Sequence, residues 1–140
     1  MPFTGAELRF IYNKTDGHCH ICHCRVSINN YGYGSGRGAW EVEHSRPRSK
    51  GGTNHRNNLL PACVPCNRDK SNFTTRTARG WKGTTRAPFS KEKKATMRSE
   101  NTTVCGVLGG LLGLAGGPVG SALGAGIGAA IGRSLKVPKA

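Results

Sequence analysis

The chain has 140 residues, which is enough for one modest domain with tails and too few for two well-buried cores. Lysine and arginine outnumber aspartate and glutamate by 21 to 7, which gives a formal net charge of +14. A charge of this sign favours nucleic acid or anionic lipid as a partner, because neutralised phosphates release their counterions, although basic residues that only solvate the surface would give the same composition.

The first predicted element is a short helix that begins at Thr4. Thr4 and Glu7 have the spacing of a capping box, in which a hydroxyl and a carboxylate each satisfy a free amide of the first turn. Three apolar side chains then share one helical face: Leu8, Ile11 and Tyr12. The turn residues 15–17 end this pattern just before the first pair of cysteines.

A loop and a strand are predicted next. Residues 29–38 contain too many glycines to hold regular structure. Residues 39–43 alternate between apolar and acidic side chains with period two, which predicts a strand that buries Trp40 and Val42 on one side.

Three further elements are predicted before residue 76. The polar stretch 44–58 contains a proline and two adjacent glycines, so we expect an irregular loop. Leu59 and Leu60 then predict a brief second strand, and residues 66–73 favour a short helix. The resulting order of strand, loop, strand and helix would place three small elements around one site.

Beyond residue 76 the composition changes twice. Residues 77–103 are basic and polar with little apolar surface to offset the entropy of ordering, which predicts a basic flexible linker. Residues 104–131 contain no charged residue and are built from glycine and aliphatic residues. The sequence therefore predicts a folded domain over 1–76, the linker over 77–103, and a separate apolar tail over 104–140.

Four of the six cysteines form two Cys-x-x-Cys pairs, which are Cys19 with Cys22 and Cys63 with Cys66. Each pair supplies two sulfurs from one tight turn, so the two pairs together fit a tetrahedral zinc site that ties distant turns together. Four thiolates leave no open position for water, so this zinc would be structural. It would replace part of the core that a domain of this size lacks.

Two alternatives remain open at these cysteines. Residues near the first pair offer other ligand atoms: His18, His20, His23 and Cys24. The cysteines could instead form disulfides or act as buried apolar residues. However, the N-terminal residues lack the apolar core of a signal peptide, so we expect a cytoplasmic domain with reduced thiols.

Motif residues in the middle of the chain resemble the HNH endonuclease family. They run from Glu43-His44-x-x-Pro47 through Gly51-Gly52 and Asn58-Leu59-Leu60 to Cys63-x-x-Cys66-Asn67-x-x-Lys70. The resemblance implies a small α+β fold with a ββα-metal core that the four-cysteine zinc site holds together. It also implies a second, catalytic divalent cation and the hydrolysis of DNA phosphodiester bonds.

The resemblance assigns roles to the matched residues. His44 would be the general base that takes a proton from water, which suits the only side chain with an unperturbed pKa near neutrality. Asn58 would orient this histidine through hydrogen bonds. Glu43 and Asn67 would hold the catalytic cation, in positions where many family members have Asp and His. Their oxygen donors favour magnesium or manganese.

Non-catalytic explanations also exist for the same residues. His44 could be an ordinary surface imidazole, and Asn58 and Asn67 could be turn or helix-cap asparagines. Four basic residues near the motif are candidates for clamping the DNA phosphates: Arg46, Arg48, Arg68 and Lys70. Phe73 and Trp81 could stack on bases, whereas Trp40 is expected in the core.

Glycines in the apolar tail recur at every fourth residue, at Gly116, Gly120, Gly124 and Gly128. A helix with such a bare face packs closely against another helix, as in the glycine zippers of membrane proteins. As a helix, residues 104–131 would be about 42 Å long, enough to cross a hydrocarbon core of about 30 Å. We therefore expect membrane association and self-association of this glycine-rich apolar helical segment. A flexible or soluble tail is the alternative, because glycine and Pro118 disfavour a helix.

The leading functional hypothesis is a bacterial or phage DNA endonuclease that uses structural zinc and catalytic magnesium or manganese. Its nuclease domain would lie in the cytoplasm, anchored at the inner membrane, and act in defence or as a toxin. A non-catalytic, zinc-dependent nucleic-acid-binding module is one alternative, and it would leave His44, Asn58 and Asn67 without a role. A membrane-inserting oligomer with an accessory domain is the other.

Overall fold

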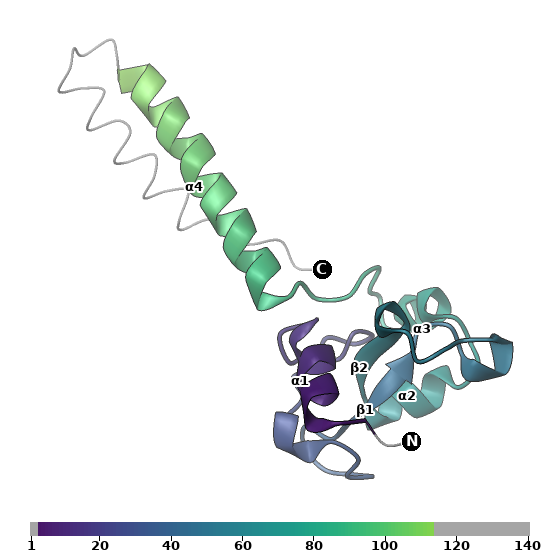
Figure 1. Cartoon of the computed structure of the whole chain (residues 1–140). Coiled ribbons are helices and arrows are strands. Elements are labelled where there is room, and N and C mark those ends of the chain that lie inside the picture. The colour runs from purple at the N-terminus through teal and green to yellow at the C-terminus, as the bar shows by residue number, and fades with distance from the viewer. Residues whose placement is uncertain (1–2, 114–140) are drawn as a thin grey trace. The chain divides into compact units, whose positions relative to one another are not determined.

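The structure is a computed structural model that describes residues 3–113, with side chains as far as Val104. The chain divides at Lys91 into two units. The first contains the helices α1, α2 and α3 and both strands, and the second contains helix α4 (Lys91–Gly113) (Figure 1). The residues predicted to carry the chemistry all lie in the first unit.

Helix α1 (Gly5–Asn13) begins with the predicted capping box. The backbone amide of Glu7 donates to Oγ1 of Thr4 at 3.3 Å, and the amide of Thr4 donates back to the Glu7 carboxylate at 2.8 Å. Ile11 is buried, and Leu8 and Tyr12 pack against the same core cluster. Both the capping box and the apolar face that the sequence predicts are confirmed.

The centre of the first unit is an antiparallel hairpin of β1 (Trp40–His44) and β2 (Leu59–Cys63). Trp40 pairs with Cys63 and His44 pairs with Leu59, so the long loop between the strands starts and ends at the same edge. Helix α2 (Val64–Lys70) follows β2 directly. The predicted order of strand, loop, strand and helix is therefore confirmed, with a longer second strand and an earlier helix.

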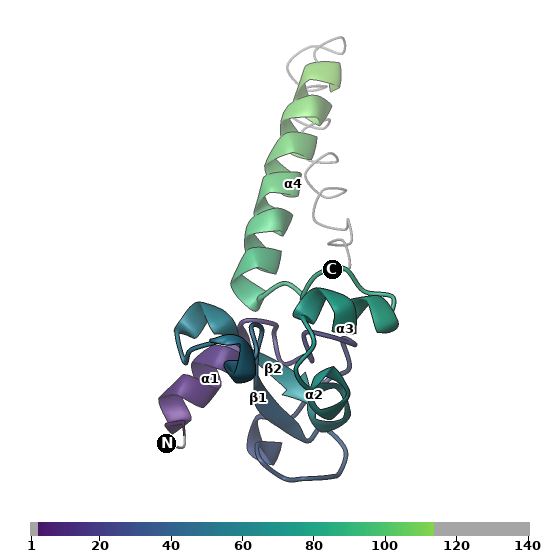
Figure 2. The same ribbon diagram turned by 90° about the vertical axis from the view of Figure 1, so that its right-hand side faces the viewer.

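Both sides of this hairpin are covered. Helix α1 packs against β2 and helix α2 contacts both strands, and the two helices lie on opposite sides of the hairpin (Figures 1 and 2). Trp40 is 0% exposed and its ring packs near those of Tyr12 and Tyr31, with centroids 5.8 and 5.1 Å away. The aromatic cluster forms the centre of the core.

The alternation predicted for β1 is only partly correct. Trp40 is buried as expected, but Val42 is half-buried and the acidic Glu43 is 2% exposed. Because helices cover both faces of the hairpin, a side chain that points away from the apolar core still meets protein rather than water. Burial of a charged group in this place requires partners, which are described below.

The loops contain three short 3-10 helices: η1 (Ile28–Asn30), η2 (Arg48–Lys50) and η3 (Arg56–Asn58). The first lies just before the glycine-rich loop, where Gly32, Gly36 and Gly38 have positive φ angles. The other two lie in the predicted irregular loop between the strands. This loop is therefore structured by single turns rather than by regular elements.

Helix α3 (Thr75–Trp81) crosses the boundary that the sequence predicts at residue 76. Ala78 is buried in the core, and the guanidinium of Arg79 donates to the backbone carbonyl of His20 at 2.9 Å. The expectation that residues from 77 onward form a linker therefore does not hold for this helix. Thr75 is also buried, and its hydroxyl donates to the carbonyl of Ser45 at 3.2 Å. These few contacts attach the helix to the first unit, and they do not show in overall composition.

The second unit begins within the remaining part of the predicted linker. Residues 91–103 are helical in α4, which fits their content of Lys, Glu, Ala, Met and Arg, all good helix formers. Helix α4 also includes the first residues of the predicted apolar tail. The predicted glycine zipper, from Gly116 to Gly132, lies outside the described residues. Within residues 3–113, no helix has the length and hydrophobicity needed to cross a membrane.

Candidate active site

The four predicted zinc ligands come together at one point. The Sγ atoms of Cys19, Cys22, Cys63 and Cys66 all lie within 4.8 Å of one another, and those of Cys22 and Cys63 are 3.7 Å apart. In a tetrahedral zinc site with Zn–S bonds of about 2.3 Å, two sulfurs lie about 3.8 Å apart. The cluster therefore has the dimensions and the chemistry of a structural zinc site.

Local backbone structure places these thiols. The amide of Cys19 donates to the carbonyl of Cys24 at 2.8 Å, which closes the first turn, and Cys63 is the N-cap of α2, which brings Cys66 into its first turn. Burial is the main cause that raises the pKa of Cys66, to about 12. A bound dication would offset the cost of burying thiolates here, because metal ligation deprotonates them.

The other ligand atoms near the first cysteine pair have different partners. Nδ1 of His18 lies 3.1 Å from the carbonyl of Thr15, and Nε2 of His23 lies 2.9 Å from the carbonyl of Arg86. Cys24 is the exception: its exposed thiol interacts with those of Cys19, Cys22 and Cys63, although it is not among the four sulfurs that all lie within 4.8 Å of one another. Among the described residues, the four-cysteine set fits zinc, and Cys24 lies beside it.

His20 belongs to a buried polar network instead of the thiol cluster. Its Nδ1 accepts from the guanidinium of Arg79 at 3.1 Å, which leaves the hydrogen on Nε2, and this atom lies 2.9 Å from the Glu43 carboxylate. Burial lowers the pKa of His20 below its usual range, although Glu43 opposes the shift. The imidazole is therefore neutral at neutral pH and keeps this orientation.

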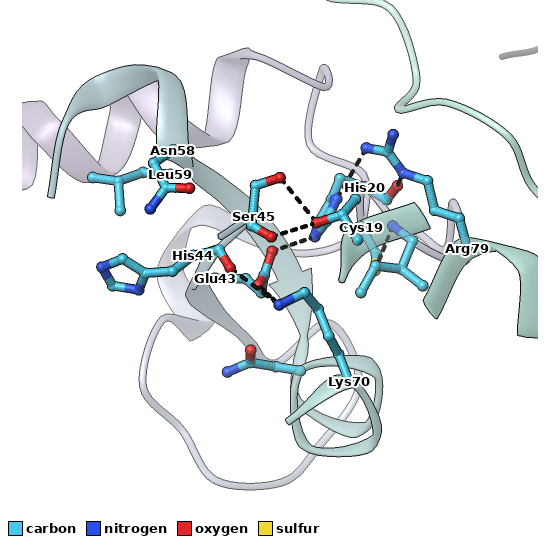
Figure 3. Close-up of polar contacts among 12 residues, drawn as sticks. Cys19, His20, Glu43, His44, Ser45, Asn58, Leu59, Lys70 and Arg79 are labelled. Atoms are coloured by element: carbon cyan, nitrogen blue, oxygen red, sulfur yellow. Dashed lines mark hydrogen bonds and ion pairs between the residues drawn. The ribbon is translucent and has the colours of Figure 1, made fainter. Parts of the chain in front are cut away.

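Glu43 joins this network to Lys70 (Figure 3). The ammonium of Lys70 is 1% exposed, forms an ion pair with the other Glu43 oxygen, and donates to the backbone carbonyl of His44 at 3.1 Å. Burial acts to raise the pKa of Glu43, but the close contacts with His20 and Lys70 outweigh it and bring the pKa below the usual range. Glu43 is therefore ionised.

Three of the four residues expected to form the active site line one hollow, and the fourth, Asn58, does not. Glu43 and His44 from β1 and Asn67 from α2 border a cavity of about 310 Å³, together with Arg48 of η2. The remaining lining residues come from the ends of the same elements and include Pro47, Lys70, Ser71 and Asn72. The fold thus brings the expected general base and both expected cation ligands to the same open space.

His44 has a side-chain partner that the sequence does not predict. Its Nε2 lies 2.8 Å from Oδ1 of Asn54, an oxygen that only accepts, so the hydrogen is on Nε2 and the lone pair of the neutral ring is on Nδ1. The imidazole points away from the Glu43 carboxylate (Figure 3). No motif position marks Asn54, because it lies in the irregular part of the loop.

Asn58 orders the backbone that follows His44 rather than its ring. Its side-chain oxygen accepts from the amide of Arg46 at 2.7 Å, its side-chain nitrogen donates to the carbonyls of Arg46 and Thr53, and its carbonyl accepts from the amide of Ser45. These bonds close the loop at the base of β1. Asn58 therefore holds the backbone next to His44, whereas the family resemblance implies that it orients the histidine.

The expected cation ligands have oxygen donors that suit a hard cation, but their side chains already contact other residues. Nδ2 of Asn67 donates to the carboxylate of Glu41 at 2.7 Å, which directs the amide and leaves its oxygen as the donor for a cation. Both oxygens of Glu43 face Lys70 and His20. An ionised carboxylate and an amide oxygen in one hollow fit a hard dication, which would compete with Lys70 for Glu43.

Three of the four residues predicted to hold phosphates are exposed. Arg46, Arg48 and Arg68 have exposed side chains, and Arg48 lines the hollow. Lys70 differs from the prediction, because its ammonium is buried in the ion pair with Glu43 and does not face solvent. In this structure Lys70 holds Glu43 and the end of β1 in place.

Comparison with known proteins finds a family match in this region. Residues 19–73 match the family model of the HNH endonucleases, a segment that contains both cysteine pairs, both strands and α2. The match covers less than half of the chain, so it supports an HNH nuclease-type domain rather than a function for the whole chain. Neither the curated proteins nor the solved structures give a significant match.

Proposed function

We propose that the chain is a metal-dependent DNA endonuclease that hydrolyses phosphodiester bonds with His44 as the general base. The observation that carries the proposal is the shared hollow, which His44, Glu43 and Asn67 all line beside a loop with exposed arginines. The match of residues 19–73 to the HNH family supports a nucleic-acid substrate and a hydrolytic reaction.

Each residue has a distinct part in this proposal. Nδ1 of His44 takes a proton from the attacking water, while Asn54 holds the ring and Asn58 holds the backbone behind it. Glu43 and Asn67 would hold magnesium or manganese, which supplies electrostatic stabilisation of the charge that develops at the phosphate. Arg48 at the rim of the hollow is placed to bind a neighbouring phosphate.

The experiment is nicking of supercoiled plasmid DNA by the zinc-loaded full chain in magnesium. We expect His44→Ala to lower the rate about 100-fold or more, because general-base catalysis contributes about that factor. His55→Ala is the matched control, since His55 is an exposed histidine of the same loop whose ring accepts from the amide of Asn57. It should nick at nearly the rate of the unchanged chain.

Zinc content and DNA binding are measured on the same samples. Equal nicking by the His44→Ala and unchanged chains, with zinc retained in both, would reject His44 as the base. Binding without any nicking in either form would favour the alternative, a zinc-dependent nucleic-acid-binding module. The buried ion pair between Glu43 and Lys70 is the observation that favours this alternative, because it occupies a cation ligand.

The membrane anchor and the role in defence or as a toxin remain predictions from the sequence. Most of the segment that would form the anchor, residues 114–131, lies outside the described residues. A neighbouring gene for an immunity protein would favour the toxin, and genes of a defence system would favour the other role.

A further inference from the structure

An exposed aromatic pair lies beside the candidate active site. Phe73 is 49% exposed and Trp81 is 52% exposed, and their rings pack edge to face, with centroids 5.3 Å apart and an interplanar angle of 75°. Two large rings that meet in solvent keep apolar surface in contact with water. In contrast, Trp40, the other tryptophan of the chain, is 0% exposed.

The pair is connected to the hollow by a short stretch of ordered backbone. Ser71 and Asn72 line the hollow together with His44, and the amide of Phe73 donates to the carbonyl of Lys70 at 2.8 Å. Trp81 comes from the end of α3, which packs against α2. A nucleic-acid strand with a phosphate in the hollow would therefore meet these rings within a few nucleotides.

Charge and ring geometry favour a nucleobase as the ligand of this aromatic pair. The chain carries a formal net charge of +14, and the exposed Arg76 lies in α3 between Phe73 and Trp81 in sequence. In an edge-to-face pair, one ring offers only its edge to the other, so ring surface is left for a further partner. Every nucleobase has a flat face that can stack on such a ring, which makes the contact independent of sequence.

We propose that Phe73 and Trp81 form a stacking site for an unpaired base of the nucleic-acid substrate, next to the hollow that holds the phosphate to be cut. Bases inside a duplex have both faces covered by their neighbours, so the site accepts a base from single-stranded, frayed or flipped-out DNA. The inference rests on the proposed function only in taking nucleic acid as the partner.

The test measures the intrinsic tryptophan fluorescence of the zinc-loaded full chain. The chain carries His44→Ala and magnesium is left out, so that the oligonucleotide probe is not cut. The probes are an oligothymidylate and an abasic oligonucleotide of the same length and charge. Because Trp40 is buried, quenching by a stacked base affects Trp81. We expect the emission of exposed tryptophan to fall with the oligothymidylate and to stay constant with the abasic strand.

Two variants separate stacking from a structural effect. Trp81→Ala should weaken binding of the oligothymidylate about 10-fold and leave binding of the abasic strand unchanged, because base stacking is lost. Trp81→Phe keeps a ring and should restore most of the affinity. Phe10→Ala is the matched control, since Phe10 is an exposed aromatic residue of α1 and its loss should change neither affinity.

Several results would overturn the proposal. Equal quenching by both strands would mean that phosphates, not bases, act on Trp81. Binding of both strands without a change in emission would exclude stacking and leave the nuclease proposal intact, whereas binding of neither strand would reject both. A dependence of the emission on protein concentration without DNA would show that a second copy of the chain covers the rings.

Discussion

Lys70 is a basic residue of the kind that binds DNA phosphates, but its buried position makes it a structural residue. Its ammonium lies between a Glu43 oxygen and the carbonyl of His44, and almost none of the side chain is exposed. Removal of one partner of a buried ion pair leaves the other charge uncompensated, which is strongly destabilising. The residue therefore contributes to the hollow by holding its wall.

We predict that Lys70→Met lowers the free energy of unfolding of the zinc-loaded chain by about 3–5 kcal/mol. Urea denaturation measures this change, and Lys50→Met, at an exposed lysine of η2, should shift the value by less than about 0.5 kcal/mol. The salt dependence of DNA binding should not change in folded Lys70→Met. A slope reduced by about one would show that Lys70 contacts a phosphate after all.

The sequence motifs predicted residues that the fold brings close together, but they did not predict the partners of these residues. Glu43, His44 and Asn67 line one hollow, and the four cysteines form one cluster. However, Asn54, which holds the His44 ring, and Arg79, which orients His20, follow no spacing rule. Both contacts depend on how a loop and a helix return to the hairpin, which local sequence patterns do not encode.

At the scale of elements, the loop between the strands is closed by two adjacent glycines. A Cβ atom on Gly52 would lie 1.9 Å from the backbone oxygen of Arg46, and the amide of Gly52 donates to the carbonyl of Pro47 at 3.0 Å. The clash is with backbone, which cannot rotate aside as a side chain can. This close approach explains why the position requires glycine.

We predict that Gly52→Ala destabilises the first unit by about 1–3 kcal/mol, because the loop must shift to admit the methyl group. It should also reduce nicking, since Ser45 and Arg46 are held by the same loop. Gly80→Ala is the matched control. An added Cβ there meets nothing within 4 Å in helix α3, so thermal unfolding should be unchanged or slightly raised. Equal midpoints of thermal unfolding for the two variants would contradict the predicted clash at Gly52.

The elements themselves were predictable where the signals are local. The capping box at Thr4 and the turn-rich loop after His44 mark α1 and the hairpin, and both are confirmed. Helix α3 was missed because most of its residues are polar, and it is attached by a few buried side chains, Thr75, Ala78 and Arg79, that follow no apolar pattern. The burial of Glu43 was missed because alternation along a strand assumes that one face meets water, while α1 and α2 cover both faces here.

At the scale of the whole molecule, the thiol cluster joins the turn after α1 to the start of α2. We predict that Cys22→Ser loses tightly bound zinc and folded structure, because the metal supplies binding energy that a small core does not. Cys24→Ser is the matched control, since Cys24 is exposed and lies beside the cluster without being one of its four mutually close sulfurs. It should retain about one zinc per chain in metal analysis and the same circular dichroism spectrum.

A strong loss of zinc in Cys24→Ser would show that Cys24 replaces one of the four ligands. Retention of zinc by Cys22→Ser, with unchanged affinity in a competition with a chelator, would contradict a four-thiolate site. Either outcome would change the ligand set without changing the position of His44 on β1.

The separation of the two cysteine turns along the chain makes completion of the domain depend on the supply of zinc. His44 leaves the ribosome before Cys63 and Cys66 do, so the nascent chain contains the proposed general base before it contains the second half of the thiol cluster. The hollow itself can form only after the second turn has been made, because Asn67 and Lys70 line it and follow Cys66 in the chain. A cell starved of zinc would therefore accumulate the polypeptide without the cutting activity, and refeeding the metal would release activity without new synthesis.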